Sequence, residues 1–135
     1  MLESAHAVAF VPSENLERSE QFFTGVLGLM PVSRSPFALV FECGGATLRV
    51  TKVDGLRPQP FTVFGWLVSD IESTVNVFRD SGALFVRYDG FDQDDHDVWT
   101  TPNGDKVAWF HDPDGNVLSL TQLRENEDSP NRVLP

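Results

Sequence analysis

Two side chains on predicted strands could do chemistry in this sequence: the histidine His6 and the arginine Arg49. Histidine is the side chain whose ordinary pKa lies nearest neutrality, so His6 is the best candidate for an acid or a base. Arg49 stands between Leu48 and Val50, and a permanently charged guanidinium is costly to bury without a partner. The pattern predicts that Arg49 binds an anion, such as a carboxylate or an enolate oxygen.

Both residues also have a purely structural interpretation. Arg49 could form an internal salt bridge, with Glu42 the nearest acid in the sequence, or extend its charged end to solvent. His6 could be a core histidine that is satisfied by a backbone carbonyl. The sequence leaves these alternatives open.

Three other features could carry chemistry, but each has a simpler explanation. Cys43 is the single cysteine, so it forms no intrachain disulfide, and a small buried side chain is expected. Five aspartates between residues 89 and 97 are most simply a solvated loop, although an acidic rim that attracts a cation is the functional interpretation. We expect His96 and His111, in that loop and beside a turn, to be solvated.

Aromatic residues are numerous, with eleven Phe and three Trp that could build a stacking pocket for a flat ligand. Strand alternation places Trp66 on the side that faces a helix, so it is predicted to pack in the core. Trp99 and Trp109 flank a turn and could line a cavity, but their faces cannot be assigned from the sequence.

The spacing of apolar residues predicts the elements that position these side chains. The first strand, at residues 6–11, ends at Pro12. A helix over 16–27 has Asn15 as its N-cap and Gly28 after its end. Three further strands are predicted at residues 30–34, 37–42 and 46–53. The order is β-α-β-β-β.

The same order repeats after a connector at residues 54–60. A strand over 61–68 is followed by a helix that begins after Asp70 and stops at Gly82. The remaining strands are predicted at residues 84–88, 106–110 and 117–122, and a longer Asp-rich loop after the first of them leads to residues 98–100. Gly45 to Thr51 aligns with Gly115 to Thr121, and residues 124–135 are predicted to be a loose polar tail.

The net charge and the length of the chain limit which binding partners the protein can have. The 135 residues carry a net charge of −10, of which residues 61–135 hold −9, from fourteen acidic and five basic residues. An acidic chain without a Lys/Arg run is a poor partner for nucleic acid or an anionic membrane. With no apolar run long enough to span a bilayer and no secretory signal, the sequence predicts a cytoplasmic protein.

Two motifs resemble the vicinal oxygen chelate superfamily, which includes glyoxalase I, bleomycin-resistance proteins and extradiol dioxygenases. The first helix of that superfamily is similar to the segment Asn15-Leu16-Glu17-Arg18-Ser19 and its continuation to Leu29. Its "DPDGN" hairpin is similar to the segment Asp112-Pro113-Asp114-Gly115-Asn116. The resemblance implies an α+β fold of two tandem βαβββ modules that form a cupped, partly closed β-barrel around a cavity. One domain is expected over residues 1–123, with modules at 5–53 and 61–123.

Strand alternation predicts which side chains face the cavity that the resemblance implies. Ala7, Ala9 and Val11 are expected to pack on the helices. The expected cavity residues are His6, Val8, Phe10, Thr47, Arg49, Thr51, Val117, Ser119 and Thr121.

The resemblance also implies where a metal would bind. In metal-dependent members the four ligand positions fall here on His6, Arg49, Val63 and Ser119, and only His6 could be a ligand. We therefore expect neither a cavity metal nor another cofactor.

The resulting hypothesis is a homodimeric, metal-independent protein that binds a small organic ligand, as bleomycin-resistance proteins do. The alternative is a glyoxalase-like isomerase or lyase, in which His6 moves a proton and Arg49 stabilises an oxyanion in place of the metal. A ligand-sensing accessory domain is a third, less supported interpretation.

Overall fold

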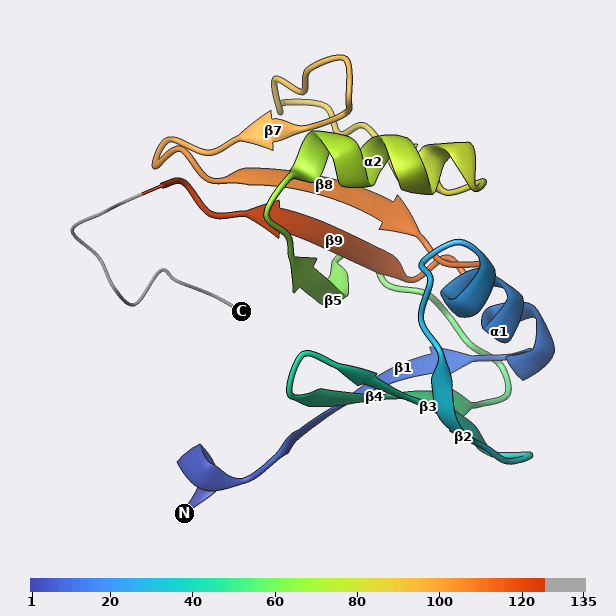
Figure 1. Ribbon diagram of the computed structural model, residues 1–135. Helices are drawn as coiled ribbons and strands as arrows, with labels where there is room; N and C mark the ends of the chain where they lie inside the picture. The colour runs from blue at the N-terminus through green and yellow to red at the C-terminus, as the bar shows by residue number, and fades with distance from the viewer. Residues whose placement is uncertain (126–135) are drawn as a thin grey trace. The chain divides into compact units, whose positions relative to one another are not determined.

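The computed structural model describes residues 1–125, which form two compact units (Figure 1). The first unit contains residues 1–60 and 112–116, and the second contains 61–111 and the chain from 117 onward. Most of the predicted polar tail, from residue 126, lies outside the described residues. No helix within residues 1–125 is long and apolar enough to cross a membrane.

The first unit is a four-stranded sheet covered on one face by a helix (Figure 1). After a 3₁₀ turn (Leu2–Ser4), the elements are β1 (Ala7–Ser13), α1 (Leu16–Gly25), β2 (Pro31–Arg34), β3 (Ala38–Cys43) and β4 (Ala46–Lys52). The strand order is β1-β4-β3-β2, with β1 parallel to β4 and the other pairs antiparallel.

The second unit repeats this plan. Its elements are β5 (Thr62–Leu67), α2 (Ile71–Asp80), β6 (Leu84–Val86), β7 (Trp99–Thr100), β8 (Lys106–His111) and β9 (Val117–Gln122). The strand order is β5-β9-β8-β6, with β7 also paired to β8 and β5 parallel to β9. The predicted α+β class and the tandem βαβββ order are confirmed, and the short β7 is an additional strand in the second unit.

Both helices begin at the predicted residues, and α1 ends at Gly25, two residues before the predicted Leu27. The side chain of Asn15 accepts a hydrogen bond from the Arg18 backbone N–H at 2.9 Å, and that of Asp70 accepts from the Ser73 N–H at 3.1 Å. Gly28 and Gly82 follow the helices with φ of 77° and 108°, values that favour glycine.

Most strand boundaries differ from the prediction by one or two residues, and the end of β1 has a clear physical cause. Pro12 was expected to end the first strand, but β1 continues through it to Ser13. β1 is an edge strand whose one neighbour is β4, so the missing N–H of Pro12 interrupts no second ladder.

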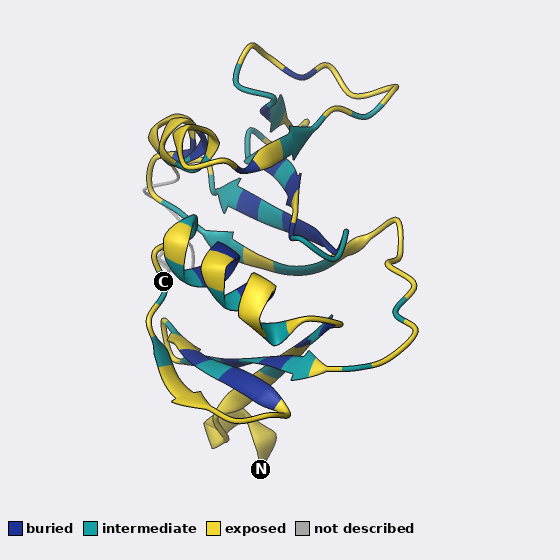
Figure 2. Cartoon of the chain, turned by 90° about the vertical axis from the view of Figure 1, so that its right-hand side faces the viewer, coloured by how far each residue is buried: buried dark blue, intermediate teal, exposed yellow. Residues whose placement is uncertain are grey.

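Each unit has its own core on the helix-facing side of its sheet (Figure 2). In the first unit Phe23 of α1 packs on Phe41, with ring centroids 5.7 Å apart. In the second, Trp66 stacks 6.4 Å from Phe110, which confirms that Trp66 is a packing residue. Val11 is buried as predicted, whereas Ala7 is exposed because α1 packs on β3 and β4.

The turn at residues 112–116 belongs to the first unit, where its polar side chains are held tightly. Asn116 is buried and donates to the Pro12 carbonyl at 2.9 Å and to the Asp112 carboxylate at 2.8 Å. Asp114 accepts from the backbone N–H of Glu14 and from the Arg18 guanidinium, at 3.1 and 2.9 Å. The two motifs that carry the family resemblance therefore contact each other.

Asp112 should make the stability of the protein depend on pH. Burial raises the pKa of this carboxyl above its ordinary 3.8, so the folded state binds a proton there more tightly than the unfolded state. The contribution of Asp112 to the free energy of unfolding is therefore fully present below pH 3.8. It is lost as the pH rises through the pKa of the folded state. We expect the free energy of unfolding of the wild type, relative to Asp112→Asn, to fall between pH 4 and pH 7 in urea titrations. A difference that rises with pH would contradict this account.

Candidate functional site

The face of the first sheet that is turned away from α1, here called the open face, gathers most of the predicted ligand residues of this unit. Strand pairing places Phe10 beside Arg49 and Val8 beside Thr47. Val8 and Phe10 are 47% and 62% exposed, respectively. The open face consists of Val8, Phe10, Val40, Glu42, Thr47, Arg49 and Thr51, with His6 at its end.

Arg49 lies at the centre of the open face without a charged partner. Its strand neighbours are Phe10 and Val40, both apolar, and its side chain is half-buried. Within residues 1–125 its guanidinium makes no hydrogen bond or ion pair. The structure therefore does not support the alternative of a salt bridge with Glu42, and it leaves a desolvated cation without an anion.

A second polar group on the open face lacks a partner. The hydroxyl oxygen of Thr51, two residues along β4 from Arg49, is buried and makes no hydrogen bond within the described residues. A buried hydroxyl without a partner costs free energy that a bound acceptor or donor would recover. Arg49 and Thr51 thus offer N–H and O–H donors on the same side of one strand.

His6, Thr47 and Glu42 form a chain of polar contacts at the end of the open face. His6 Nε2 is 2.8 Å from Thr47 Oγ1 and 3.4 Å from Glu42 Oε2, and the Thr47 hydroxyl donates to Glu42 Oε1 at 2.8 Å. Because the single hydroxyl proton of Thr47 points to Glu42, His6 Nε2 must be the donor to Thr47. In the neutral ring this leaves Nδ1 as the acceptor, the form that a general base requires.

The sequence reasoning missed the role of Glu42, although a signal for it exists. Gly44 and Gly45 both have positive φ, 53° and 90°, and close a two-residue hairpin between β3 and β4. A two-residue turn determines the register, which places Glu42 opposite Thr47.

We expect neutral His6 to carry its proton on Nε2 rather than Nδ1. Two-bond ¹H–¹⁵N spectra of the imidazole rings distinguish the two tautomers, and His96 and His111 provide comparisons in the same sample. The reverse tautomer, with the proton on Nδ1, would contradict the contact chain described above.

In the second unit the predicted residues of β9 share one face, as alternation requires. Ser119 pairs with Gly65 and Trp109, and Thr121 pairs with Val107. A Cβ at Gly65 would lie 2.3 Å from Ser119 Oγ, so a larger residue there would force the Ser119 side chain to move. Val117 lies on this face as well but is 3% exposed, so it offers almost no surface to a ligand.

The faces of Trp99 and Trp109, which the sequence could not assign, are now clear. Trp99 pairs with Val107, so both tryptophans lie on the same face as Ser119, which is turned away from α2. Phe91 lies 4.6 Å from Trp99 and 5.4 Å from Trp109 between ring centroids, and Tyr88 lies 5.2 Å from Trp109. The four rings form an aromatic cluster.

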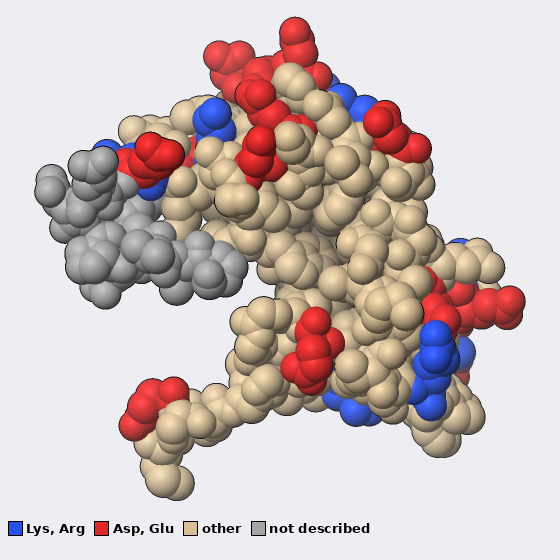
Figure 3. All heavy atoms as spheres, viewed as in Figure 1, with Lys and Arg blue, Asp and Glu red and all other residues tan. Residues whose placement is uncertain are grey.

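The Asp-rich loop is partly neutralised rather than freely solvated. Asp97 pairs with Arg79 and Arg87, and the side chain of Asp94 accepts from the backbone N–H groups of His96 and Val98. In Figure 3, acidic side chains still gather at the top of the view, where the loop between β6 and β7 lies. The loop is organised by Gln93, whose buried side chain makes three hydrogen bonds to backbone groups.

One cluster in the second unit has donor atoms that suit a metal. Glu72, Asp94 and His96 place one ligand atom each within 4.8 Å of the others, and no other such trio occurs within residues 1–125. The two carboxylates are exposed and the imidazole is intermediate in burial, as is common on surfaces without an ion.

Residues 4–120 match the glyoxalase/bleomycin resistance protein/dioxygenase superfamily. The chain belongs to this superfamily. No curated protein matches the chain.

Solved structures of this superfamily have the same fold. The chain is similar to a glyoxalase/bleomycin resistance protein/dioxygenase from Alicyclobacillus acidocaldarius, with TM-score 0.71, 15% identity and 97% of each chain covered. A glyoxalase-related enzyme from Fulvimarina pelagi has TM-score 0.68 and 20% identity, and the match covers 93% of this chain and 95% of that enzyme. A lactoylglutathione lyase from Agrobacterium tumefaciens has TM-score 0.68 and 19% identity, and the match covers 88% of this chain and 93% of that lyase. At these identities the likeness extends to the fold alone.

The glyoxalase superfamily often uses a divalent metal, and the residues of this member do not suit one. Of the four corresponding positions, Arg49 is a cation and Val63 has no donor atom and falls at a register shift of β5. His6 already uses Nε2 in its contact with Thr47. Ser119 offers only a neutral hydroxyl, so this set lacks the three or four imidazole and carboxylate ligands that a divalent ion requires.

Proposed function

We propose that this protein is a small-molecule-binding member of the glyoxalase/bleomycin resistance superfamily that works without the usual metal. Its ligand carries a carboxylate or a similar oxygen anion, which binds Arg49 on the open face. The observation that carries the proposal is the half-buried Arg49 guanidinium, which has no anionic partner within residues 1–125.

The surroundings of Arg49 support an organic anion rather than an inorganic one. Phe10 and Val40 flank the guanidinium and would contact an apolar portion of the ligand. The unpartnered hydroxyl of Thr51 would donate a further hydrogen bond to the anion. A small α-keto or 2-hydroxy acid provides both kinds of group.

An enzymatic function is the second candidate, and the His6–Thr47–Glu42 chain favours it. A neutral His6 with a free Nδ1 could take a proton from a bound ligand, while Arg49 stabilises the resulting oxyanion. The reaction would then be an isomerisation or a lyase step on a carbonyl compound.

We also propose that the protein acts as a homodimer in the cytoplasm. The first unit exposes several large apolar side chains away from Arg49, among them Met30 at 72%, Val32 at 63% and Phe37 at 74%. A second copy would cover such a surface, and light scattering after size exclusion should give twice the 15.0 kDa chain mass. A monomer at micromolar concentration would contradict the dimer. The single cysteine accords with a reducing compartment.

Elemental analysis followed by calorimetric titration tests the proposed function. We expect purified protein to contain no stoichiometric divalent metal and to bind pyruvate or lactate with one saturable site. A stoichiometric metal, or binding that appears only after a metal is added, would overturn the proposal.

A further inference from the structure

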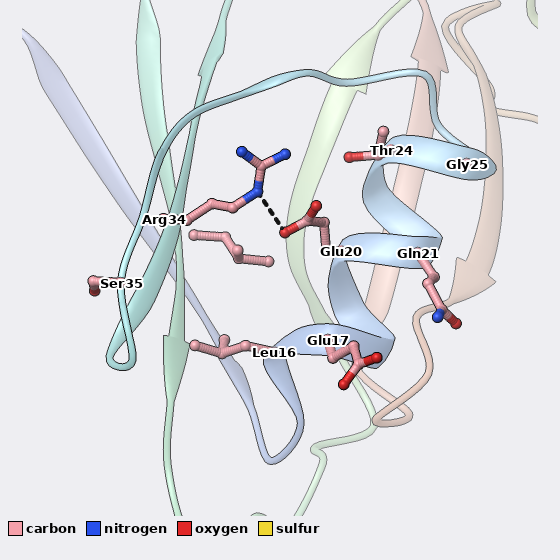
Figure 4. Close-up of a pocket in the computed structure, with 9 residues that line it drawn as sticks. Leu16, Glu17, Glu20, Gln21, Thr24, Gly25, Arg34 and Ser35 are labelled. Carbon is pink, nitrogen blue, oxygen red and sulfur yellow. Dashed lines mark hydrogen bonds and ion pairs between the residues drawn. The ribbon is translucent and has the colours of Figure 1, made fainter.

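A groove of about 610 Å³ lies on the helix side of the first sheet, on the opposite face from Arg49 (Figure 4). α1 forms one wall with Glu17, Glu20 and Thr24, and Arg34 of β2 forms the other. Leu16 and Leu39 supply the apolar lining. The groove is separate from the open face and from the proposed function.

An ion pair crosses the groove and leaves donors and acceptors unused. Arg34 Nε donates to Glu20 Oε1 at 2.9 Å, and this is the one hydrogen bond of either side chain within residues 1–125. Both Nη groups of Arg34 and the second oxygen of Glu20 are therefore available. Arg34 is exposed and Glu20 is only partly buried, so the ion pair holds the two side chains weakly.

Thr24 adds a hydroxyl that lacks a partner. Its oxygen is buried and makes no hydrogen bond in the described part of the chain. Figure 4 shows this hydroxyl directed across the groove toward the head group of Arg34. A ligand atom between them could bind both groups at once.

We propose that the groove binds a free α-amino acid with an aliphatic side chain. The carboxylate would accept from the Arg34 Nη groups and the Thr24 hydroxyl, and the ammonium would donate to Glu20. The alkyl chain would lie on Leu16 and Leu39. Arg34 and Glu20 carry opposite charges side by side, which matches a ligand whose two charged groups are attached to one carbon.

Ligands with one charge fit this groove less well. A simple carboxylate would approach the carboxylates of Glu17 and Glu20, and a simple amine would approach the guanidinium of Arg34. A zwitterion leaves the net charge of the groove unchanged and offers a partner to each charged group.

Titration of the ¹⁵N-labelled full chain with L-leucine tests the proposal, with 4-methylpentanoate and 3-methylbutylamine as probes that each lack one charged group. We expect leucine to shift the amide resonances of α1 and β2 saturably, and each single-charge probe to bind at least about tenfold more weakly. Equal binding of the three probes would overturn the proposal. Shifts confined to β1, β3 and β4 residues of the open face, or no shift at all, would also overturn it.

Two variants test the contacts without disturbing the core. Thr24→Val keeps the side-chain shape and Arg34→Gln removes the guanidinium, and each should weaken leucine binding at least fivefold. Arg57→Gln, in the exposed connector, is the matched control and should bind as the wild type does. Unchanged binding in both groove variants would overturn the assignment.

Discussion

Replacing Arg49 by methionine should weaken the binding of a small carboxylate roughly 10- to 100-fold, because one charge-assisted hydrogen-bonding group contributes about 1.5–3 kcal/mol. The same change should not lower the free energy of unfolding. Arg49 makes no ion pair or hydrogen bond within residues 1–125, and methionine preserves the apolar stem that packs between Phe10 and Val40. Calorimetric titration and urea unfolding measure the two quantities.

The matched control for this experiment is Arg57→Met, which removes one positive charge from the exposed connector. It should leave both affinity and stability within error of the wild type, because a distant exposed charge is screened. If Arg49→Met destabilises the protein by more than about 2 kcal/mol, Arg49 has a structural role and the functional interpretation is wrong.

Replacing Asn116 by alanine should destabilise the protein by about 3 kcal/mol. The change removes the hydrogen bonds to the part-buried Pro12 carbonyl and the buried Asp112 carboxylate, and an acceptor left without its partner costs about 1–3 kcal/mol. It also frees the turn at 112–116 from the first unit. Urea unfolding monitored by tryptophan fluorescence gives the difference.

Asn103→Ala is the control for the turn, because Asn103 is an exposed turn residue at the other end of β8. We expect it to change stability by less than about 0.5 kcal/mol. A similar loss in both variants would mean that the effect of Asn116→Ala does not come from its buried contacts.

The elements of the fold could be predicted because local signals agree with each other. Asn15 and Asp70 cap the helices, Gly28 and Gly82 end them, and the apolar residues repeat at helical or strand spacing. Pro12 misled the prediction, since whether a proline ends a strand depends on where that strand lies in its sheet.

The candidate site could be predicted only in part. Alternation placed Thr47, Arg49 and Thr51 on one face of β4, because it is a property of a single strand. Whether Glu42 pairs with Arg49 or with His6 depends on the register between β3 and β4, which the spacing within one strand does not contain.

Loop geometry was the least predictable part. Trp99 and Trp109 share a face because β7 and β8 pair, and the loop beside them depends on Gln93, a residue with no motif around it. Irregular loops are held by specific side-chain contacts to the backbone, for which periodicity provides no signal.

The most direct test of the central proposal observes the side chain of Arg49 itself. Its Nε–H resonance can be assigned by its absence from the spectrum of Arg49→Met and followed during titration of the wild type with pyruvate. We predict a saturable shift of this resonance whose dissociation constant equals the calorimetric value. A resonance that stays unmoved while pyruvate binds would contradict the assignment of Arg49 as the anion-binding residue.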